Sequence, residues 1–87
     1  MNQPKKSLGQ HWLDDPAALD SIIASSGVEQ GNQVLEIGPG HGSLTKKILE
    51  AGATVTAVEL DDTLALQLVS KVKPWKQNLR VVNEDIL

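Results

Sequence analysis

The chain has 87 residues, a formal net charge of −3 at pH 7 and no cysteine. This length suits one small domain, and 40% hydrophobic with 22% charged residues is an ordinary globular composition. The lack of cysteine excludes a disulfide framework and a thiolate metal site. Without a long apolar run near the N-terminus, we expect neither a signal peptide nor a membrane span, and hence a cytoplasmic protein.

The N-terminal part divides into an arm and a helix. Residues 1–13 show no helical or strand period, so we expect an extended arm there. A helix is expected from residue 14 onward, because Asp14 and Asp15 are good N-caps and Pro16 suits the first helical position. Apolar side chains recur at helical spacing until Gly27, which is a typical C-terminal stop.

A glycine-rich stretch, Gly38-Pro39-Gly40-His41-Gly42, follows an expected strand at 33–37 and precedes a helical pattern that starts near Ser43. Glycine adopts backbone conformations that other residues rarely adopt, and it lets a ligand approach the main chain closely. The free N–H groups of the next helix face the same space. The stretch is therefore typical of a turn that binds a nucleotide-like ligand. The alternative is a turn that only connects strand and helix.

The elements expected after this turn are a helix that stops at Gly52, a strand over 53–59, a helix that is capped by Asp61 and Asp62 and ends at Pro74, and a strand over 79–83. This α-β-α-β-α-β order with short connections predicts an α/β fold with a parallel sheet. Three strands with two crossovers form a βαβαβ half of a doubly wound sheet in the strand order 3-2-1. Its ligand lies beyond the carboxyl ends of the strands.

Glycine spacing separates two kinds of ligand. Gly38, Gly40 and Gly42 follow Glu36 in the pattern E-x-G-x-G-x-G, whereas a dinucleotide turn has the pattern G-x-G-x-x-G. Ser43 occupies the position of the third dinucleotide glycine. The pattern resembles the first motif of S-adenosylmethionine-dependent methyltransferases, in which the turn wraps a sulfonium amino acid.

Two acids are expected on the same rim of the sheet as the glycine turn. Glu59 ends the second strand, where its carboxylate can accept hydrogen bonds from both hydroxyls of a ribose. Asp85 follows the third strand and can accept a hydrogen bond from the exocyclic amine of an adenine. The alternative for both is a solvated acid at a strand end.

Four motifs in order resemble the N-terminal part of ribosomal RNA adenine dimethyltransferases: Lys6-Ser7-Leu8-Gly9-Gln10-His11-Trp12-Leu13, Val34-Leu35-Glu36-Ile37-Gly38-Pro39-Gly40, Val58-Glu59-Leu60-Asp61 and Glu84-Asp85. The resemblance covers essentially the whole chain. It is closer to the small-subunit enzymes than to their erythromycin-resistance relatives. It implies a Rossmann-like methyltransferase fold, S-adenosyl-L-methionine as cofactor, and ribosomal RNA of the small subunit as partner.

The resemblance also implies the cofactor contacts. Gln10, His11 and Leu13 match the motif that folds over the methionine end of the cofactor. The glycine stretch with Glu36 matches the cofactor turn, Glu59 the ribose acid and Asp85 the adenine acid. Trp12 departs from the family, which usually has Phe there.

In this family, the target adenine is held by an Asn-Leu-Pro-Tyr-type motif after a fourth strand. The 87 residues contain no such motif and no Phe or Tyr, so we expect no catalytic residue among them. Residues 14–87 are then the N-terminal half of the methyltransferase domain, which binds the cofactor without turnover. The alternatives are a stand-alone S-adenosylmethionine-binding module and the NAD-binding half of an oxidoreductase.

The first strand carries a further expectation. Val34 to Ile37 are apolar apart from Glu36, and a strand at 33–37 without a fourth strand beside it is a sheet edge. We therefore expect the chain to pair first strand to first strand as a dimer, to swap segments, or to fold marginally.

Overall fold

The computed structural model describes residues 15–84, so the expected arm over 1–13 and Asp85 lie outside the described residues. The elements in chain order are α2 (Pro16–Ser26), β1 (Gln33–Ile37), α3 (Ser43–Glu50), β2 (Thr54–Val58), α4 (Asp62–Lys71), the 3₁₀ helix η1 (Lys73–Asn78) and β3 (Leu79–Val82). Across residues 15–84, no helix has the length and apolar character needed to cross a membrane.

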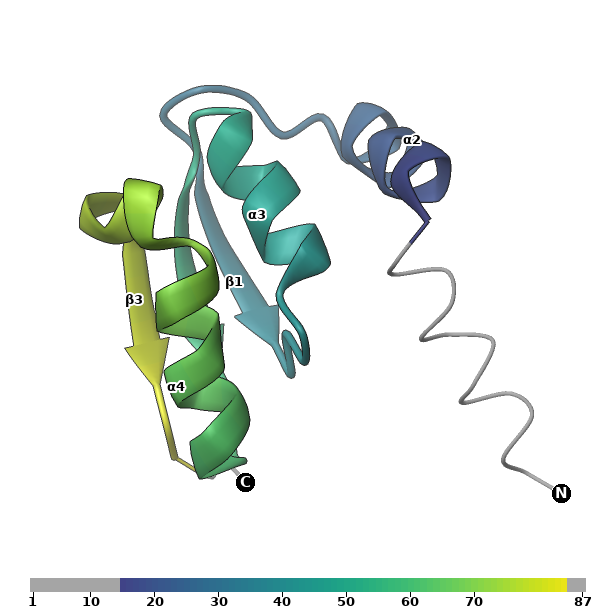
Figure 1. The fold of residues 1–87 in the computed structure, drawn as a ribbon. Coiled ribbons are helices and arrows are strands. Elements are labelled where there is room, and N and C mark those ends of the chain that lie inside the picture. The colour runs from purple at the N-terminus through teal and green to yellow at the C-terminus, as the bar shows by residue number, and fades with distance from the viewer. Residues whose placement is uncertain (1–14, 85–87) are drawn as a thin grey trace, which may run out of the picture.

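The three strands form one parallel sheet with β2 in the centre. Val55 pairs with Val34 of β1 on one side and with Leu79 of β3 on the other. Figure 1 shows α3 and α4 side by side on one face of the sheet, with α2 next to α3. The predicted βαβαβ arrangement and the strand order 3-2-1 are confirmed.

The hydrophobic core lies between the sheet and these helices. Its largest fully buried side chains are Leu49, Leu68, Val55, Val72 and Thr45. Successive strand residues point to opposite faces, so in β1 the half-buried residues alternate with exposed ones. Leu35 and Ile37 of β1 are 65% and 57% exposed, because the face to which they point carries no helix among the described residues.

The helix ends largely follow the capping residues that the sequence indicates. The Asp15 carboxylate accepts hydrogen bonds from the first turn of α2, and Gly27 ends that helix in a left-handed conformation with φ of 73°. The Asp61 carboxylate accepts from the Leu64 N–H at 2.9 Å and caps α4. These interactions confirm the predicted starts of both helices, although Asp14 lies outside the described residues.

One element was not predicted. The helix was expected to end at Pro74, but α4 ends at Lys71 with Val72 as its C-cap, and Pro74 lies within η1 rather than in a loop. The Trp75 N–H donates to the Val72 carbonyl at 2.9 Å, and the Trp75 side chain packs against the core. The apolar indole thus holds this segment on the protein, which local residue preferences do not show.

An ion pair connects α2 with α3. The Lys47 Nζ lies 2.9 Å from the Asp20 Oδ1, and this hydrogen bond raises the pKa of Lys47. Asp20 is largely exposed, so the pair orients α2 without adding much stability.

Gly42 and Gly40 provide a matched test of the packing beside the glycine turn. Both have positive φ, which costs an alanine about 1–2 kcal/mol. A Cβ at Gly42 would lie 2.6 Å from Cδ1 of Leu68, which is 1% exposed and would have to shift within the core, whereas a Cβ at Gly40 meets nothing within 4 Å. Overpacking of a core adds about 1–3 kcal/mol.

We therefore expect Gly42→Ala to lower the free energy of unfolding in urea clearly more than Gly40→Ala does. Equal losses of unfolding free energy for the two variants would show that Leu68 of α4 does not pack closely against Gly42.

Candidate functional site

The glycine turn at 38–42 has the geometry that its spacing predicts. Gly38, Gly40 and Gly42 have φ of 66°, 58° and 81°, a region that side chains rarely adopt. The Gly38 N–H donates to the Val58 carbonyl at 2.8 Å, which ties the start of the turn to the end of β2. The alternating glycines are therefore required by the path of the backbone, since each takes a left-handed conformation.

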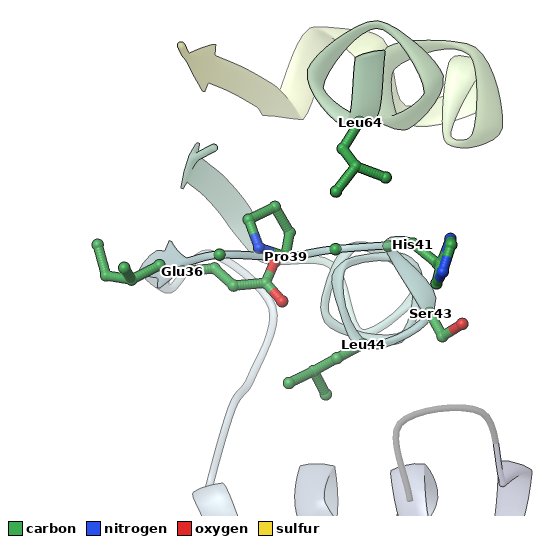
Figure 2. A pocket seen from close by; sticks show the side chains of 10 residues that line it. Glu36, Pro39, His41, Ser43, Leu44 and Leu64 are labelled. Atoms are coloured by element: carbon green, nitrogen blue, oxygen red, sulfur yellow. The ribbon is translucent and has the colours of Figure 1, made fainter. Parts of the chain in front are cut away.

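A pocket of about 360 Å³ lies on this turn. Residues 36–44 line it together with Leu64, which projects from α4 (Figure 2). The pocket lies beyond the carboxyl ends of the parallel strands, where ligands bind in open α/β sheets. Predicted site residues Glu36, Gly38, Gly40 and Gly42 all line it.

The Glu36 side chain extends from β1 beneath Pro39 toward α3 (Figure 2). It is half-buried, and the Thr45 hydroxyl donates a hydrogen bond to its Oε1. Burial raises the pKa of the Glu36 carboxyl, and the Thr45 hydrogen bond partly offsets this rise. A half-buried acid with a raised pKa in a pocket is a candidate for contact with a cationic ligand.

Glu59 is 7% exposed and contacts the turn from the side of β2. Its Oε1 accepts a hydrogen bond from the Gly40 N–H at 3.2 Å, and its Oε2 accepts one from the Asp61 N–H at 3.0 Å. Each carboxylate oxygen keeps further acceptor capacity. Glu59 therefore positions the turn while remaining able to accept from a ligand. It does not line the 360 Å³ pocket itself.

Three residues of this site were not identified from the sequence. Thr45 lies on the same face of α3 as Ile48 and Leu49, so a polar residue at helical spacing within an apolar face could have indicated it. Asn83 follows β3, and its Nδ2 donates to the carbonyls of Glu59 and Leu60 at 2.8 and 3.1 Å. Leu64 projects from α4 and lines the pocket.

The remaining predicted contacts, Gln10, His11, Leu13 and Asp85, lie outside the described residues. Within 15–84, no three side chains of His, Asp or Glu are grouped so that they could hold a metal ion.

A family model described as ribosomal RNA adenine dimethylase matches residues 1–87. The chain belongs to this family. A ribosomal RNA small subunit methyltransferase of Arabidopsis thaliana is 46% identical over 84 residues, which are 94% of this chain and 24% of the relative. Ribosomal RNA small subunit methyltransferase A of Mycobacterium tuberculosis is 46% identical over 89 residues, or 98% of this chain and 28% of the relative. The chain spans about a quarter of the length of these relatives.

Solved structures agree with this assignment. A dimethyladenosine transferase from Plasmodium falciparum is 30% identical with a TM-score of 0.72, over 83% of this chain and 26% of that chain. The 23S rRNA methyltransferase ErmE is 34% identical with a TM-score of 0.72, over 82% of this chain and 29% of that chain. The predicted Rossmann-like methyltransferase fold and the family resemblance are both confirmed.

The raised pKa of Glu36 gives a test of its burial. A carboxyl whose pKa is higher in the folded chain than in the unfolded chain favours folding when it is protonated. This contribution is complete below the ordinary value of 4.5 and is lost as the pH rises through the folded pKa. We therefore expect Glu36→Gln to raise the melting temperature at pH 7 and to leave it unchanged below pH 4.

The control is Glu29→Gln, which changes an exposed acid in the loop before β1. If the melting temperature of Glu36→Gln equals that of the original chain at every pH, burial does not disfavour the Glu36 carboxylate.

Proposed function

We propose that this chain is the S-adenosylmethionine-binding part of a ribosomal RNA adenine N6,N6-dimethyltransferase that acts on small-subunit RNA in the cytoplasm. The observation that carries the proposal is the pocket on the glycine turn, with Glu36 lining it and Glu59 holding the turn from β2. Membership of the ribosomal RNA adenine dimethylase family supports the RNA substrate and a role in ribosomal RNA processing.

The charge of the site favours this cofactor. S-adenosylmethionine supplies, when bound, an electrophilic methyl group on a cationic sulfonium next to an ammonium group. Glu36 would attract that cationic end, and Glu59 would accept hydrogen bonds from the ribose hydroxyls. The pyrophosphate of NAD would instead meet the Glu36 carboxylate, which repels it. In addition, Ser43 occupies the position of the third glycine of the dinucleotide pattern. For these two reasons an NAD-binding oxidoreductase is the weaker alternative.

Base recognition requires groups other than those of this pocket. An enzyme that modifies a flipped base stacks it between aromatic or apolar side chains and hydrogen-bonds its edge. The 87 residues contain neither Phe nor Tyr, and none of the four prolines follows an asparagine or an Asn-Leu pair. We therefore propose that this polypeptide by itself binds the cofactor and transfers no methyl group, as a stand-alone binding module also would.

The cofactor proposal is tested by titrating the 87-residue chain with S-adenosylhomocysteine in a calorimeter, with NAD as competitor. We expect weak binding that NAD does not displace. Glu59→Gln should weaken binding by about ten- to a hundredfold, because hydrogen bonds to a charged group contribute about 1.5–3 kcal/mol. It should also lower the free energy of unfolding, since the Gly40 and Asp61 N–H groups lose a charged acceptor.

Glu29→Gln, which alters an exposed acid away from the pocket, should bind like the original chain. An unchanged affinity for Glu59→Gln would show that Glu59 only supports the turn. Transfer of labelled methyl groups into small-subunit ribosomal RNA by this polypeptide would contradict the proposed lack of turnover.

We also propose that the 87-residue chain self-associates through β1. Among the described residues, β1 is an edge of the sheet, and its outward side chains Leu35 and Ile37 are largely exposed. An apolar edge strand with unpaired backbone groups tends to pair with another chain.

Sedimentation of the chain at high concentration should therefore show a dimer that Leu35→Lys weakens. Leu66→Lys changes a leucine that is 74% exposed on α4 and should leave the dimer intact. A monomer at every concentration, or equal effects of the two variants, would refute the pairing.

A further inference from the structure

Thr45 is a fully buried polar side chain. It is 0% exposed and lies in α3, in the same helix as the buried Ile48 and Leu49. A buried hydroxyl without a partner costs free energy, so its partner indicates what it does. That partner is the Glu36 carboxylate, to which the Thr45 Oγ1 donates.

This hydrogen bond joins two elements that line the pocket. Glu36 belongs to β1 and Thr45 to the first turn of α3, and the pocket-lining turn at 38–42 runs between them in the sequence. The bond therefore ties β1 to α3 next to the turn. A carboxylate has about four acceptor sites, so accepting from Thr45 leaves Glu36 able to accept from a ligand.

We infer that Thr45 is a positioning residue of the cofactor pocket, whose hydroxyl orients the Glu36 carboxylate for contact with a cationic ligand. The inference rests on the proposed function for the identity of that ligand. Thr45 acts on the ligand only through Glu36, because Thr45 does not itself line the pocket.

The surroundings of Glu36 support this role. Burial raises the pKa of Glu36, and the Thr45 hydrogen bond is the cause that lowers it. No neighbouring charge within residues 15–84 contributes to that shift. β2 places Ala57 beside Glu36 in the sheet, and the His41 ring, on the pocket rim, points away from Glu36 (Figure 2). The Thr45 hydrogen bond is thus the cause that favours the ionised form of Glu36.

A purely structural role for Thr45 is the competing explanation, because the bond also ties α3 to β1. The two roles differ in what responds to the loss of the hydroxyl. Loss of the hydroxyl shifts the titration of Glu36 in either case, because the bond is donated to its carboxylate. A structural tie leaves the affinity for the ligand and its pH dependence unchanged, whereas a positioning residue changes both.

The test compares Thr45→Val with Thr45→Ser, which keeps a hydroxyl. Thr54→Val is the matched control, because its hydroxyl donates to the Asn32 carbonyl at the opposite end of β2. The Glu36 carboxyl is titrated by carbon NMR in the ligand-free chain, and the affinity for S-adenosylhomocysteine is measured between pH 5 and pH 8.

We expect Thr45→Val to raise the Glu36 titration midpoint and to weaken S-adenosylhomocysteine binding about tenfold at pH 7, with a larger loss at lower pH. Thr45→Ser should have a Glu36 midpoint and an affinity for S-adenosylhomocysteine close to those of the original chain. Thr54→Val should change neither the midpoint nor the affinity. Should Thr45→Val not fold, the Thr45 hydroxyl proton in the original chain serves instead, and its NMR shift should follow the protonation of Glu36.

A Glu36 midpoint that is the same in Thr45→Val and the original chain would overturn the inference, as would a Thr45 hydroxyl proton that ignores Glu36 protonation. If the midpoint shifts but the original chain binds no S-adenosylhomocysteine, the proposed cofactor is wrong, and the proposed role of Thr45 in binding that cofactor is wrong as well. If the original chain binds and Thr45→Val binds equally well at every pH, the proposed function stands and Thr45 is only structural.

Discussion

The pocket depends on how the backbone N–H groups of the glycine turn are satisfied. The chain passes from β1 to α3 within residues 38–42, and within this turn the Gly42 N–H bonds to the Pro39 carbonyl at 3.0 Å. The Gly38 N–H bonds to the Val58 carbonyl and the Gly40 N–H to the Glu59 carboxylate. The turn is therefore held by the end of β2, a segment that follows it in the sequence by a whole helix. A substitution that disturbs that end of β2 is therefore expected to alter the conformation of the turn and the shape of the pocket.

The two acids beside the turn, Glu59 and Glu36, lie in different environments. Glu59 is nearly fully buried, and each of its carboxylate oxygens accepts a backbone N–H, so its charge is compensated by hydrogen bonds. Glu36 accepts the Thr45 hydroxyl, and its pKa is nevertheless raised by burial. A carboxylate kept in an unfavourable environment lowers stability, and such costs are typical of binding sites. The fold thus places a stable, structural acid on one side and a less favourable one in the pocket.

The sheet is covered on one face by α3 and α4, while Leu35 and Ile37 remain exposed on the other. Doubly wound sheets carry helices on both faces, and the curated relatives are much longer than this chain, which spans 24–28% of them. An apolar strand face of this kind is suited to contact with further protein. The pocket itself is lined by the end of β1, the turn, the start of α3 and Leu64 of α4.

The sequence by itself determined the element order, the parallel sheet, the capped helix starts and the glycine turn, because each depends on local residue preferences and on periodicity. It also placed Glu59 on the same rim as the glycine turn, since the carboxyl ends of parallel strands meet there. Only the tertiary structure decided that Glu59 binds the turn, that Thr45 holds Glu36, and that Trp75 packs η1 onto the core. These contacts join residues from different elements, and the geometry of such contacts arises from packing that no local pattern encodes.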